Sequence, residues 1–166
     1  MEGPPVNRFQ IHVLTLSFQA TGQIDVIGNL ADFLTDPARD ALILSQANLS
    51  SIPPGGPIRS MTRPEISIRK PEVSFAYFPE QEAQNQVRLL ARTEELVLYT
   101  PLAILRGSVH MTAEARINDF LATTKTAYIP ITQARLFMLI DLPFPFPQEC
   151  ALLLLNQQYV QLFHTP

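Results

Sequence analysis

The hydrophobic residues of this chain fall in short runs in which apolar and polar positions alternate, a period of two that is typical of half-buried β-strands. Fifteen prolines and six glycines punctuate the chain, which predicts many turns and few long helices. In the first part of the chain the pattern predicts strands near residues 9–18, 23–27, 41–49, 58–68 and 73–78. In the second part it predicts strands near residues 96–105, 108–111, 127–140, 151–155 and 159–164. The predicted fold class is therefore mainly β.

Turn residues set the expected connections. Gly22 is expected to close the turn between the first two strands, and Asn156-Gln157 is expected to close a hairpin between the last two. Asn29 is a suitable N-cap for a short helix that ends before the next proline. Arg116–Leu121 occupies the matching place in the second part of the chain. Each part is thus expected to read strand, strand, helical turn, strand, strand, strand.

The two parts also share sequence. A shift of 87 positions superposes Asp32-Phe33-Leu34 on Asp119-Phe120-Leu121, and Gln46-Ala47 on Gln133-Ala134. The same shift keeps the apolar positions in phase to the end of each part, whereas a strand slipped by one residue would turn its apolar side chains to the wrong face. Self-similarity at a fixed shift predicts a tandem duplication of one small unit.

The duplication predicts the domain organisation. We expect a first β-rich repeat over residues 1–78, a connecting segment over residues 79–94 and a second β-rich repeat over residues 95–166. Each repeat is expected to form a small five-stranded barrel or a compact curved sheet. Units this small are marginally stable alone, so we expect the two to pack against each other in a pseudo-two-fold arrangement.

The connecting segment differs in pattern from its neighbours. Residues 80–92 contain no glycine or proline and place Ala83, Val87 and Leu90 on one face of a helix. We therefore expect a connecting helix packed on one of the repeats. A solvated linker is the alternative.

Composition narrows the classes of function. The net charge is −3 and each repeat is nearly neutral, with no basic cluster larger than Arg69-Lys70, so nucleic acid is not an expected partner. No apolar run reaches the length of a membrane span, and residues 1–10 do not resemble a secretory signal. The single cysteine, Cys150, cannot form an internal disulfide, which favours a cytoplasmic location.

Candidate catalytic chemistry is sparse. His12, His110 and His164 lack a second ligand at metal-binding spacing, since the pairing of His110 with Glu114 would require a helix where a strand is predicted. Cys150 precedes the most apolar run of the chain and is expected to be buried rather than nucleophilic. No phosphate-binding or dinucleotide-binding glycine motif is present. We expect no catalytic residue, no metal and no cofactor, and hence not an enzyme.

Two loops offer candidate binding residues. Phe144 and Phe146 lie between prolines in the segment 142–147, and exposed aromatic residues on a stiff loop are typical of interfaces. The alternative is that they cap a barrel or fill the groove between the repeats. Arg59 and Arg63 follow a glycine pair at residues 55–56 that could cradle an anion, with an ordinary turn-rich loop as the alternative.

One motif resembles a known family. The run Arg116-Ile117-Asn118-Asp119-Phe120-Leu121, followed later by an apolar strand that ends in Asn156, is similar to a motif of a family of small uncharacterised bacterial domains. The resemblance covers about residues 98–164. The first repeat departs from the motif, with Asn29 and Ala31 in place of its arginine and its serine or asparagine. The resemblance implies a β-rich domain of unknown function and brings no activity.

The motif allows two readings of its charged residues. Arg116 and Asp119 could form a polar binding pair. Alternatively, Asp119 stabilises the start of the helix and pairs with Arg116. Asp32 keeps the aspartate in the first repeat without an arginine, which favours the structural role for Asp32 and Asp119.

These observations favour a non-enzymatic binding or assembly module made of two fused β units. Its expected partner is another protein or a second copy of the chain, with neither nucleic acid nor a membrane. A small-ligand sensor with a pocket between the repeats is the alternative, and an enzyme is the third hypothesis.

Overall fold

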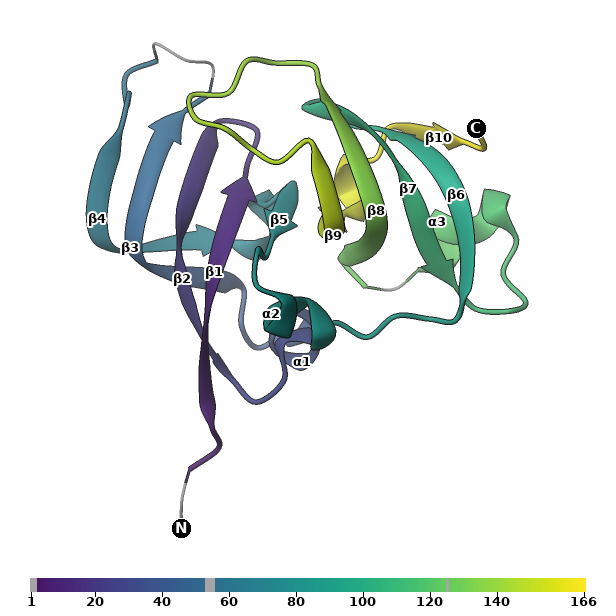
Figure 1. The fold of residues 1–166 in the computed structure, drawn as a ribbon, viewed down its shortest axis with the longest axis horizontal. Helices are drawn as coiled ribbons and strands as arrows, with labels where there is room; N and C mark the ends of the chain where they lie inside the picture. Colours follow the sequence, from purple (N-terminus) through teal and green to yellow (C-terminus); the bar gives the residue numbers. More distant parts are fainter. Residues whose placement is uncertain (1–2, 53–55, 125) are drawn as a thin grey trace.

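The computed structural model describes residues 3–52, 56–124 and 126–166 (Figure 1). Strands hold 51% of the described residues and short helices 14%, which confirms the mainly β class. The described strands are β1 (Val6–Leu14), β2 (Phe18–Ile27), β3 (Ala41–Ser51), β4 (Met61–Arg69), β5 (Phe75–Tyr77), β6 (Arg92–Tyr99), β7 (Ala103–Met111), β8 (Tyr128–Met138), β9 (Glu149–Asn156) and β10 (Leu162–His164). The helices are α1 (Leu30–Thr35), α2 (Gln81–Asn85) and α3 (Phe120–Thr123), with 3-10 turns η1 (Lys70–Glu72), η2 (Ile117–Asp119) and η3 (Gln157–Tyr159).

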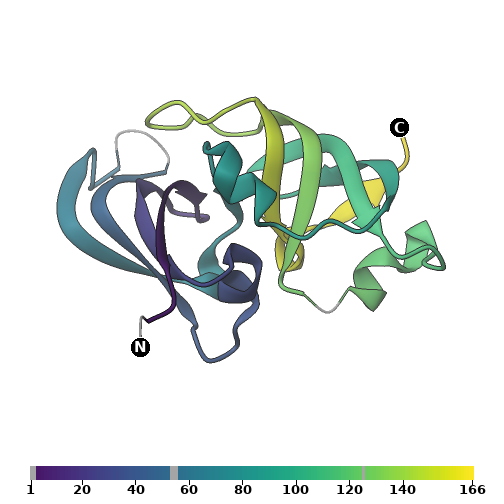
Figure 2. The same ribbon diagram turned by 60° about the horizontal axis from the view of Figure 1, so that its bottom comes forward.

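All of these strands belong to one antiparallel sheet in the order β10-β6-β7-β8-β9-β5-β1-β2-β3-β4. Figures 1 and 2 show β1–β4 on one side of the molecule and β6–β9 on the other. Within the described part of the chain, β10 pairs only with β6 and β4 pairs only with β3. The sheet is therefore not closed, and the expected barrel is not formed.

The strand order is the same in the first half of the sheet, β5-β1-β2-β3-β4, and in the second half, β10-β6-β7-β8-β9. The halves meet where β5 of the first pairs with β9 of the second. A two-fold axis would instead pair the same edge of each half with itself. The expected pseudo-two-fold arrangement is therefore wrong, and the halves are joined head to tail.

The first turn of each half lies earlier than the glycine pattern predicted. Backbone N–H of Thr15 donates to the carbonyl of Phe18 at 2.9 Å, and its Oγ1 accepts from two backbone N–H groups in the turn. Thr100 makes the same set of bonds in the second half, with its N–H donating to the carbonyl of Ala103 at 3.0 Å. A threonine side chain, rather than a glycine, thus organises both turns.

Gly22 lies inside β2, so its predicted turn is wrong, and Gly107 takes the same place in β7. Both face a bulge in the neighbouring strand, where Gln46 and Gln133 have positive φ angles of 48° and 51°. A Cβ at Gly22 would lie 2.9 Å from the carbonyl oxygen of Ser45, which is too close. The glycines are therefore needed for close approach of the two strands.

The last strands of each half also differ from the prediction. No hairpin joins β9 to β10, because η3 lies between them and β10 pairs with β6 instead. In the first half η1 likewise separates β4 from β5, and β5 crosses to pair with β1. Hydrogen bonds from Lys70 N–H to the Asp40 carbonyl and from Gln157 N–H to the Ala127 carbonyl fix these two crossings in the same way.

The short helices follow the capping pattern of the sequence. The Asn29 side chain accepts a hydrogen bond from Ala31 N–H at 2.7 Å, which confirms it as the N-cap of α1. At the other end of α1, Lys70 Nζ donates to the Phe33 carbonyl at 2.8 Å. Of the expected connecting helix only Gln81–Asn85 is helical, and the chain reaches β6 through a turn and irregular backbone over residues 86–91.

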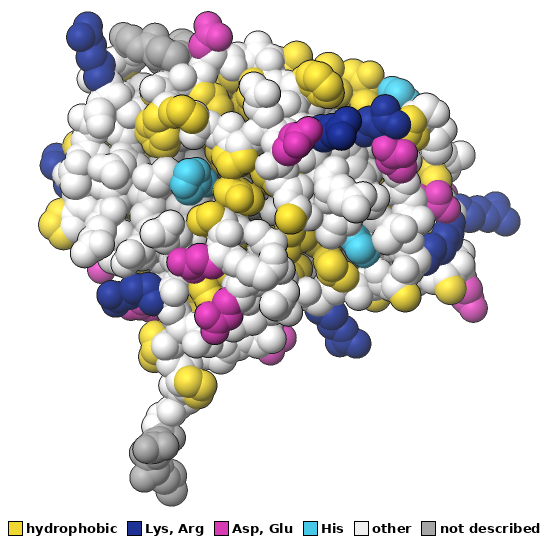
Figure 3. Space-filling view, viewed as in Figure 1, with side chains coloured by type: hydrophobic (Ala, Val, Ile, Leu, Met, Phe, Trp, Pro, Cys, Tyr) yellow, Lys and Arg dark blue, Asp and Glu magenta, His cyan; other side chains and the backbone are white. Residues whose placement is uncertain are grey.

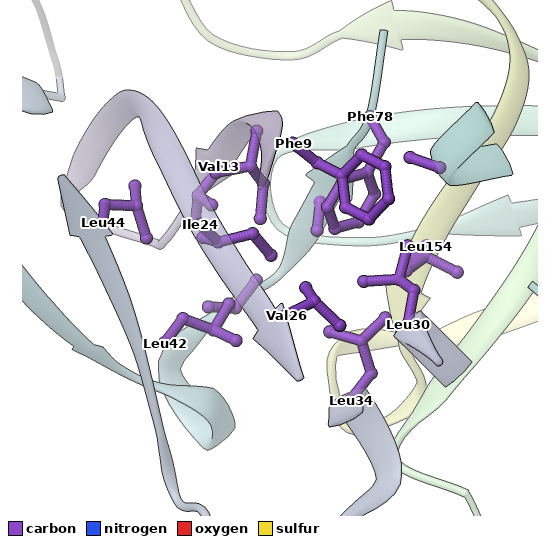
Figure 4. Packing of buried hydrophobic residues seen from close by; sticks show 14 of the residues in the cluster. Phe9, Val13, Ile24, Val26, Leu30, Leu34, Leu42, Leu44, Phe78 and Leu154 are labelled. Carbon is purple, nitrogen blue, oxygen red and sulfur yellow. The ribbon is translucent and has the colours of Figure 1, made fainter. Parts of the chain in front are cut away.

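The core has two clusters that exchange side chains across the junction. The first lies under β1–β3 and α1, and Leu154 from β9 and Tyr128 from β8 belong to it (Figure 4). The second lies under β6–β9, and Leu14 and Phe75 from the first half belong to it. Because each half supplies apolar side chains to the core of the other, the two halves stabilise each other.

Candidate functional site

The junction between the halves is a three-residue strand pairing with a polar lock beside it. Phe75 lies opposite Leu155, Ala76 opposite Leu154, and Tyr77 opposite Leu153. All of these residues except Tyr77 are buried. The main-chain pairing continues to Asn156, whose N–H donates to the carbonyl of Ser74 at 2.9 Å.

The polar lock consists of carbonyl groups in η1 that accept hydrogen bonds from the second half. Tyr128 Oη donates to the Lys70 carbonyl at 2.7 Å, and burial raises the pKa of this phenol far above its ordinary value. The Pro71 carbonyl accepts from Tyr159 Oη at 3.1 Å and from Asn156 Nδ2 at 3.3 Å, and from the Gln158 side chain. The bonds of Tyr128 and Asn156 satisfy side-chain polar groups that the junction would otherwise bury unpaired, whereas those of Gln158 and Tyr159 lie at its exposed rim.

The loop over residues 139–148 forms a second bridge between the halves, and in Figures 1 and 2 it reaches from β8 over the first half before returning to β9. The Gln19 side chain, 1% exposed, donates to the Phe144 carbonyl at 2.8 Å and accepts from Phe144 N–H at 3.3 Å. Phe146 is buried in the second core cluster. The loop thus connects the two halves, with Phe144 partly buried and Phe146 buried rather than exposed.

Phe146 lies against two aromatic rings of the first half. Its ring centroid is 6.3 Å from both His12 and Tyr77, and those two rings are 6.0 Å apart and perpendicular. His12 Nδ1 is buried without a hydrogen-bond partner. Burial lowers the pKa of His12, which favours the neutral imidazole, and the ring packs against Tyr77 and Phe146.

A groove of about 560 Å³ lies where α1, the segment after α2 and the second half meet. Its walls include Ala31 and Leu34 of α1, Val87 of the connecting segment, and Phe120 and Tyr128 of the second half. Asp32, Arg88 and His110 add polar groups to its lining. This groove lies between the two halves of the sheet.

His110 is held by both of its ring nitrogens. Nδ1 lies 2.8 Å from the Leu90 carbonyl and Nε2 lies 2.9 Å from Thr132 Oγ1. An imidazole engaged in this way anchors the connecting segment to β7 and β8 and leaves no nitrogen for a substrate. Across residues 3–52, 56–124 and 126–166, no group of three or more His, Cys, Asp or Glu side chains is placed to hold a metal ion.

The only cysteine of the chain is buried. Burial raises the pKa of the Cys150 thiol to about 11, and Sγ lies 3.9 Å from the Pro147 carbonyl. A thiolate at neutral pH is therefore strongly disfavoured, which leaves no reactive nucleophile here.

Arg59 and Arg63 lie at the outer end of the first half and are exposed. Their local contacts are to backbone: Ser50 Oγ donates to the Arg59 carbonyl at 2.5 Å, and Arg63 Nη1 donates to the Thr62 carbonyl at 3.1 Å. Residues 53–55, which include the first glycine of the predicted anion cradle, lie outside the described residues. The described neighbourhood shows two arginines near the free edge of the sheet.

The residues of the repeated motif lie in two separate turns. Asp32 is exposed in the first turn of α1 and lines the groove. Arg116 is exposed at the start of η2, and Asp119 N–H donates to the Arg116 carbonyl at 3.0 Å. The two aspartates occupy equivalent turns of the two halves.

The two ends of the sheet are a feature that sequence patterns alone did not reveal. In the part of the chain that the structure describes, the outer edges of β4 and β10 have no neighbouring strand. Leu162 in β10 is 54% exposed, and Ile66 and Ile68 in β4 are only partly buried.

The charged side chains of the described residues do not gather into a patch of one sign in the view of Figure 3. Figure 3 shows positive and negative side chains interspersed over the face that it draws. Comparison with protein families, with curated proteins and with solved structures found no match. No helix in the described residues has the length and apolar character required to cross a membrane.

Proposed function

We propose that this protein is a non-enzymatic assembly module that adds strands of other protein chains to the two open ends of its sheet. The observation that supports it most is the open architecture itself, because the ten-stranded sheet of the described residues ends in two unpaired edges, with Leu162 exposed on one and Ile66 and Ile68 partly buried on the other. Natural sheets usually protect such edges with charges or proline, and residues 66–68 of β4 carry neither. Strand addition supplies main-chain hydrogen bonds, and exposed apolar side chains supply the remaining affinity.

We further propose that the two halves arose by tandem duplication of one unit. In support, the strand order is the same in each half, and Gly22 and Gly107 face equivalent bulges at Gln46 and Gln133. Equivalent hydrogen bonds at Thr15 and Thr100 point the same way. We also infer that the second unit belongs to the family of small bacterial domains that it resembles, and that the protein acts in the cytoplasm.

The absence of enzymatic activity is part of the proposal. Its support is that three of the candidate groups have structural roles: His110 bonds through both ring nitrogens, His12 is packed among aromatic rings, and Cys150 is a buried thiol. Each of these arrangements disfavours the proton transfer or nucleophilic attack that catalysis needs.

Sedimentation velocity over a wide range of protein concentrations tests the proposed assembly. We expect the mass to rise with concentration, and we expect Leu162→Lys and Ser67→Lys to abolish that rise because each places a charge at an open edge. Ile43→Lys is the matched control, since Ile43 is 52% exposed but lies on the inner strand β3. A constant monomer mass, or association that survives both edge variants, would refute the proposal.

The groove between the halves supports a second candidate function, binding of a small apolar ligand. Its volume of about 560 Å³ falls in the range of small-molecule sites, and apolar side chains line most of it. Thermal unfolding in the presence of a panel of small apolar metabolites tests this: a ligand that raises Tm should lose its effect in Ala31→Phe, which fills the groove. Ala122→Phe, on the exposed side of α3, is the matched control. An unchanged Tm across the panel would rule this candidate out.

A further inference from the structure

The contact between the two halves joins two different edges, and within the described residues each half leaves unpaired the edge that the other half uses. The first half uses β5 and the second half uses β9, so the equivalent edges of the opposite halves, β10 and β4, stay unpaired in the described structure. A contact that joins two different surfaces head to tail can be repeated between molecules, and it closes into a ring or extends into a chain. The two outer strands of the sheet, β10 and β4, are therefore the two edges that one more contact of this kind would join.

The residues at the ends match those at the junction. At the shift of 87 positions, Leu162 and Phe163 of β10 correspond to Phe75 and Ala76 of β5, which are buried by β9. Leu162, in contrast, is 54% exposed. On the other side, Ile66 and Ile68 of β4 correspond to Leu153 and Leu155, which are fully buried. Apolar side chains thus occupy the equivalent positions on both edges: Leu162 is exposed, whereas Ile66, Ile68 and Phe163 are partly buried against the cores of their own halves.

We propose that β10 of one molecule pairs antiparallel with β4 of a second copy of this chain, in the register that β5 and β9 use within the molecule. That register places Gln161 opposite Arg69, Leu162 opposite Ile68, Phe163 opposite Ser67 and His164 opposite Ile66. It follows from the observed pairs of Ser74 with Asn156 and of Phe75 with Leu155. This inference rests on the proposed assembly function and names its partner and its geometry.

The remainder of β4 is built to prevent other pairings. Pro64 removes a main-chain donor two residues before the stretch that would pair, and Arg63 and Glu65 expose charges beside it. Proline and charged residues on an edge strand are the usual protection against indiscriminate pairing. Residues 66–68 carry neither and supply three of the four β4 positions in the predicted contact, the fourth being Arg69.

The contact between molecules is weaker than the junction within the molecule. Leu154, buried at the junction, is replaced by Ser67 on β4. The side chains that donate to the η1 carbonyls at the junction are Tyr128, Asn156, Gln158 and Tyr159. Their equivalents on the first half are Ala41, Arg69, Pro71 and Glu72, of which only Arg69 has a donor. Association should therefore be reversible and dependent on concentration.

Cysteine cross-linking tests the geometry. Arg69→Cys and Gln161→Cys are made in separate chains, because both positions are exposed and the register places them opposite each other. A short bis-maleimide should link the mixture of the two variants into dimers and should link neither variant alone. Wild type controls for Cys150, which is buried. Ser60→Cys mixed with Gln161→Cys controls for random encounter, because Ser60 is exposed but lies outside the predicted contact.

A second variant makes the test a gain of affinity rather than a loss. Ser67→Leu restores the residue that Leu154 supplies at the junction, and burying one leucine should tighten association between about tenfold and a hundredfold in sedimentation. Ser60→Leu, the same change outside the contact, should leave association unchanged. An unchanged affinity in Ser67→Leu would overturn the proposed register.

The outcomes separate this inference from the proposed function. Dimers from Arg69→Cys alone would mean that two β4 edges pair symmetrically, which overturns the head-to-tail contact while edge assembly stands. If Leu162→Lys and Ser67→Lys abolish association but the mixture of cysteine variants gives no cross-link, the head-to-tail contact is likewise overturned while edge assembly stands. A monomer at every concentration overturns both. Cross-linking in the mixture alone, together with tighter association of Ser67→Leu, supports both.

Discussion

Leu154 provides the most direct test of how the two halves depend on each other. It lies on β9 in the second half, is 3% exposed, and packs in the core cluster of the first half (Figure 4). Leu154→Ala removes three buried carbon atoms, which costs about 2.4 kcal/mol of hydrophobic stabilisation at roughly 0.8 kcal/mol per buried carbon. The cavity that remains adds to this, so we expect the free energy of unfolding to fall by about 3 kcal/mol.

Urea unfolding followed by circular dichroism measures this change, and thermal unfolding should show Tm lower by roughly 6–12 °C for a chain of this size. Leu162→Ala is the control, because Leu162 is 54% exposed and its truncation should cost less than about 0.5 kcal/mol. If Leu154→Ala costs under about 1 kcal/mol, the junction is not closely packed, and the argument that each half completes the core of the other fails.

Three further predictions follow from the described contacts. Gly107→Ala should lower stability by about 1–3 kcal/mol in urea unfolding, because its Cβ would meet Ile131 Cγ2 at 2.6 Å, whereas Gly3→Ala, with open space around it, should be neutral. Because the pKa of His12 in the folded protein is lowered from 6.5, its contribution to the free energy of unfolding is present above pH 6.5 and is lost as the pH falls through the folded pKa. His12→Phe should flatten that part of the dependence of the free energy of unfolding on pH, and an unchanged dependence would contradict this. With its pKa raised to about 11, Cys150 should react with iodoacetamide at pH 8 at least about a hundredfold more slowly in the folded protein than in urea, and equal rates would show that the thiol is accessible.

Local patterns predicted those features whose causes are local. Ala41–Ser51 and Tyr128–Met138 form the strands expected near residues 41–49 and 127–140, because alternation of apolar and polar residues reports which side chains face the core. The Asn29 cap is confirmed because its donor, Ala31 N–H, lies two residues along the chain. The end of the connecting helix was missed, since Val87 and Leu90 fit a helical face but are held by contacts with distant residues.

The glycine interpretation failed for a different reason. A glycine between two apolar runs predicts a turn, and at Gly22 the structure has a strand instead. Gly22 is required because a bulge at Gln46 brings the next strand close, and that demand comes from a residue more than twenty positions away. The candidate binding residue Phe146 was placed on the correct loop, but its burial depends on His12 and Tyr77 in the other half.

The sequence by itself determined that the chain is mainly β, where most strands lie, and that two parts carry the same pattern, because these properties depend on neighbouring residues and on side-chain phase. Only the tertiary structure decided how the parts are joined. Residues 75–77 and 162–164 are short strands at equivalent positions, yet one is enclosed between β1 and β9 and the other is left at an open edge. Main-chain hydrogen bonding is the same for any partner strand. The choice of partner therefore depends on the packing and the chain path around each edge, which a local sequence pattern does not predict.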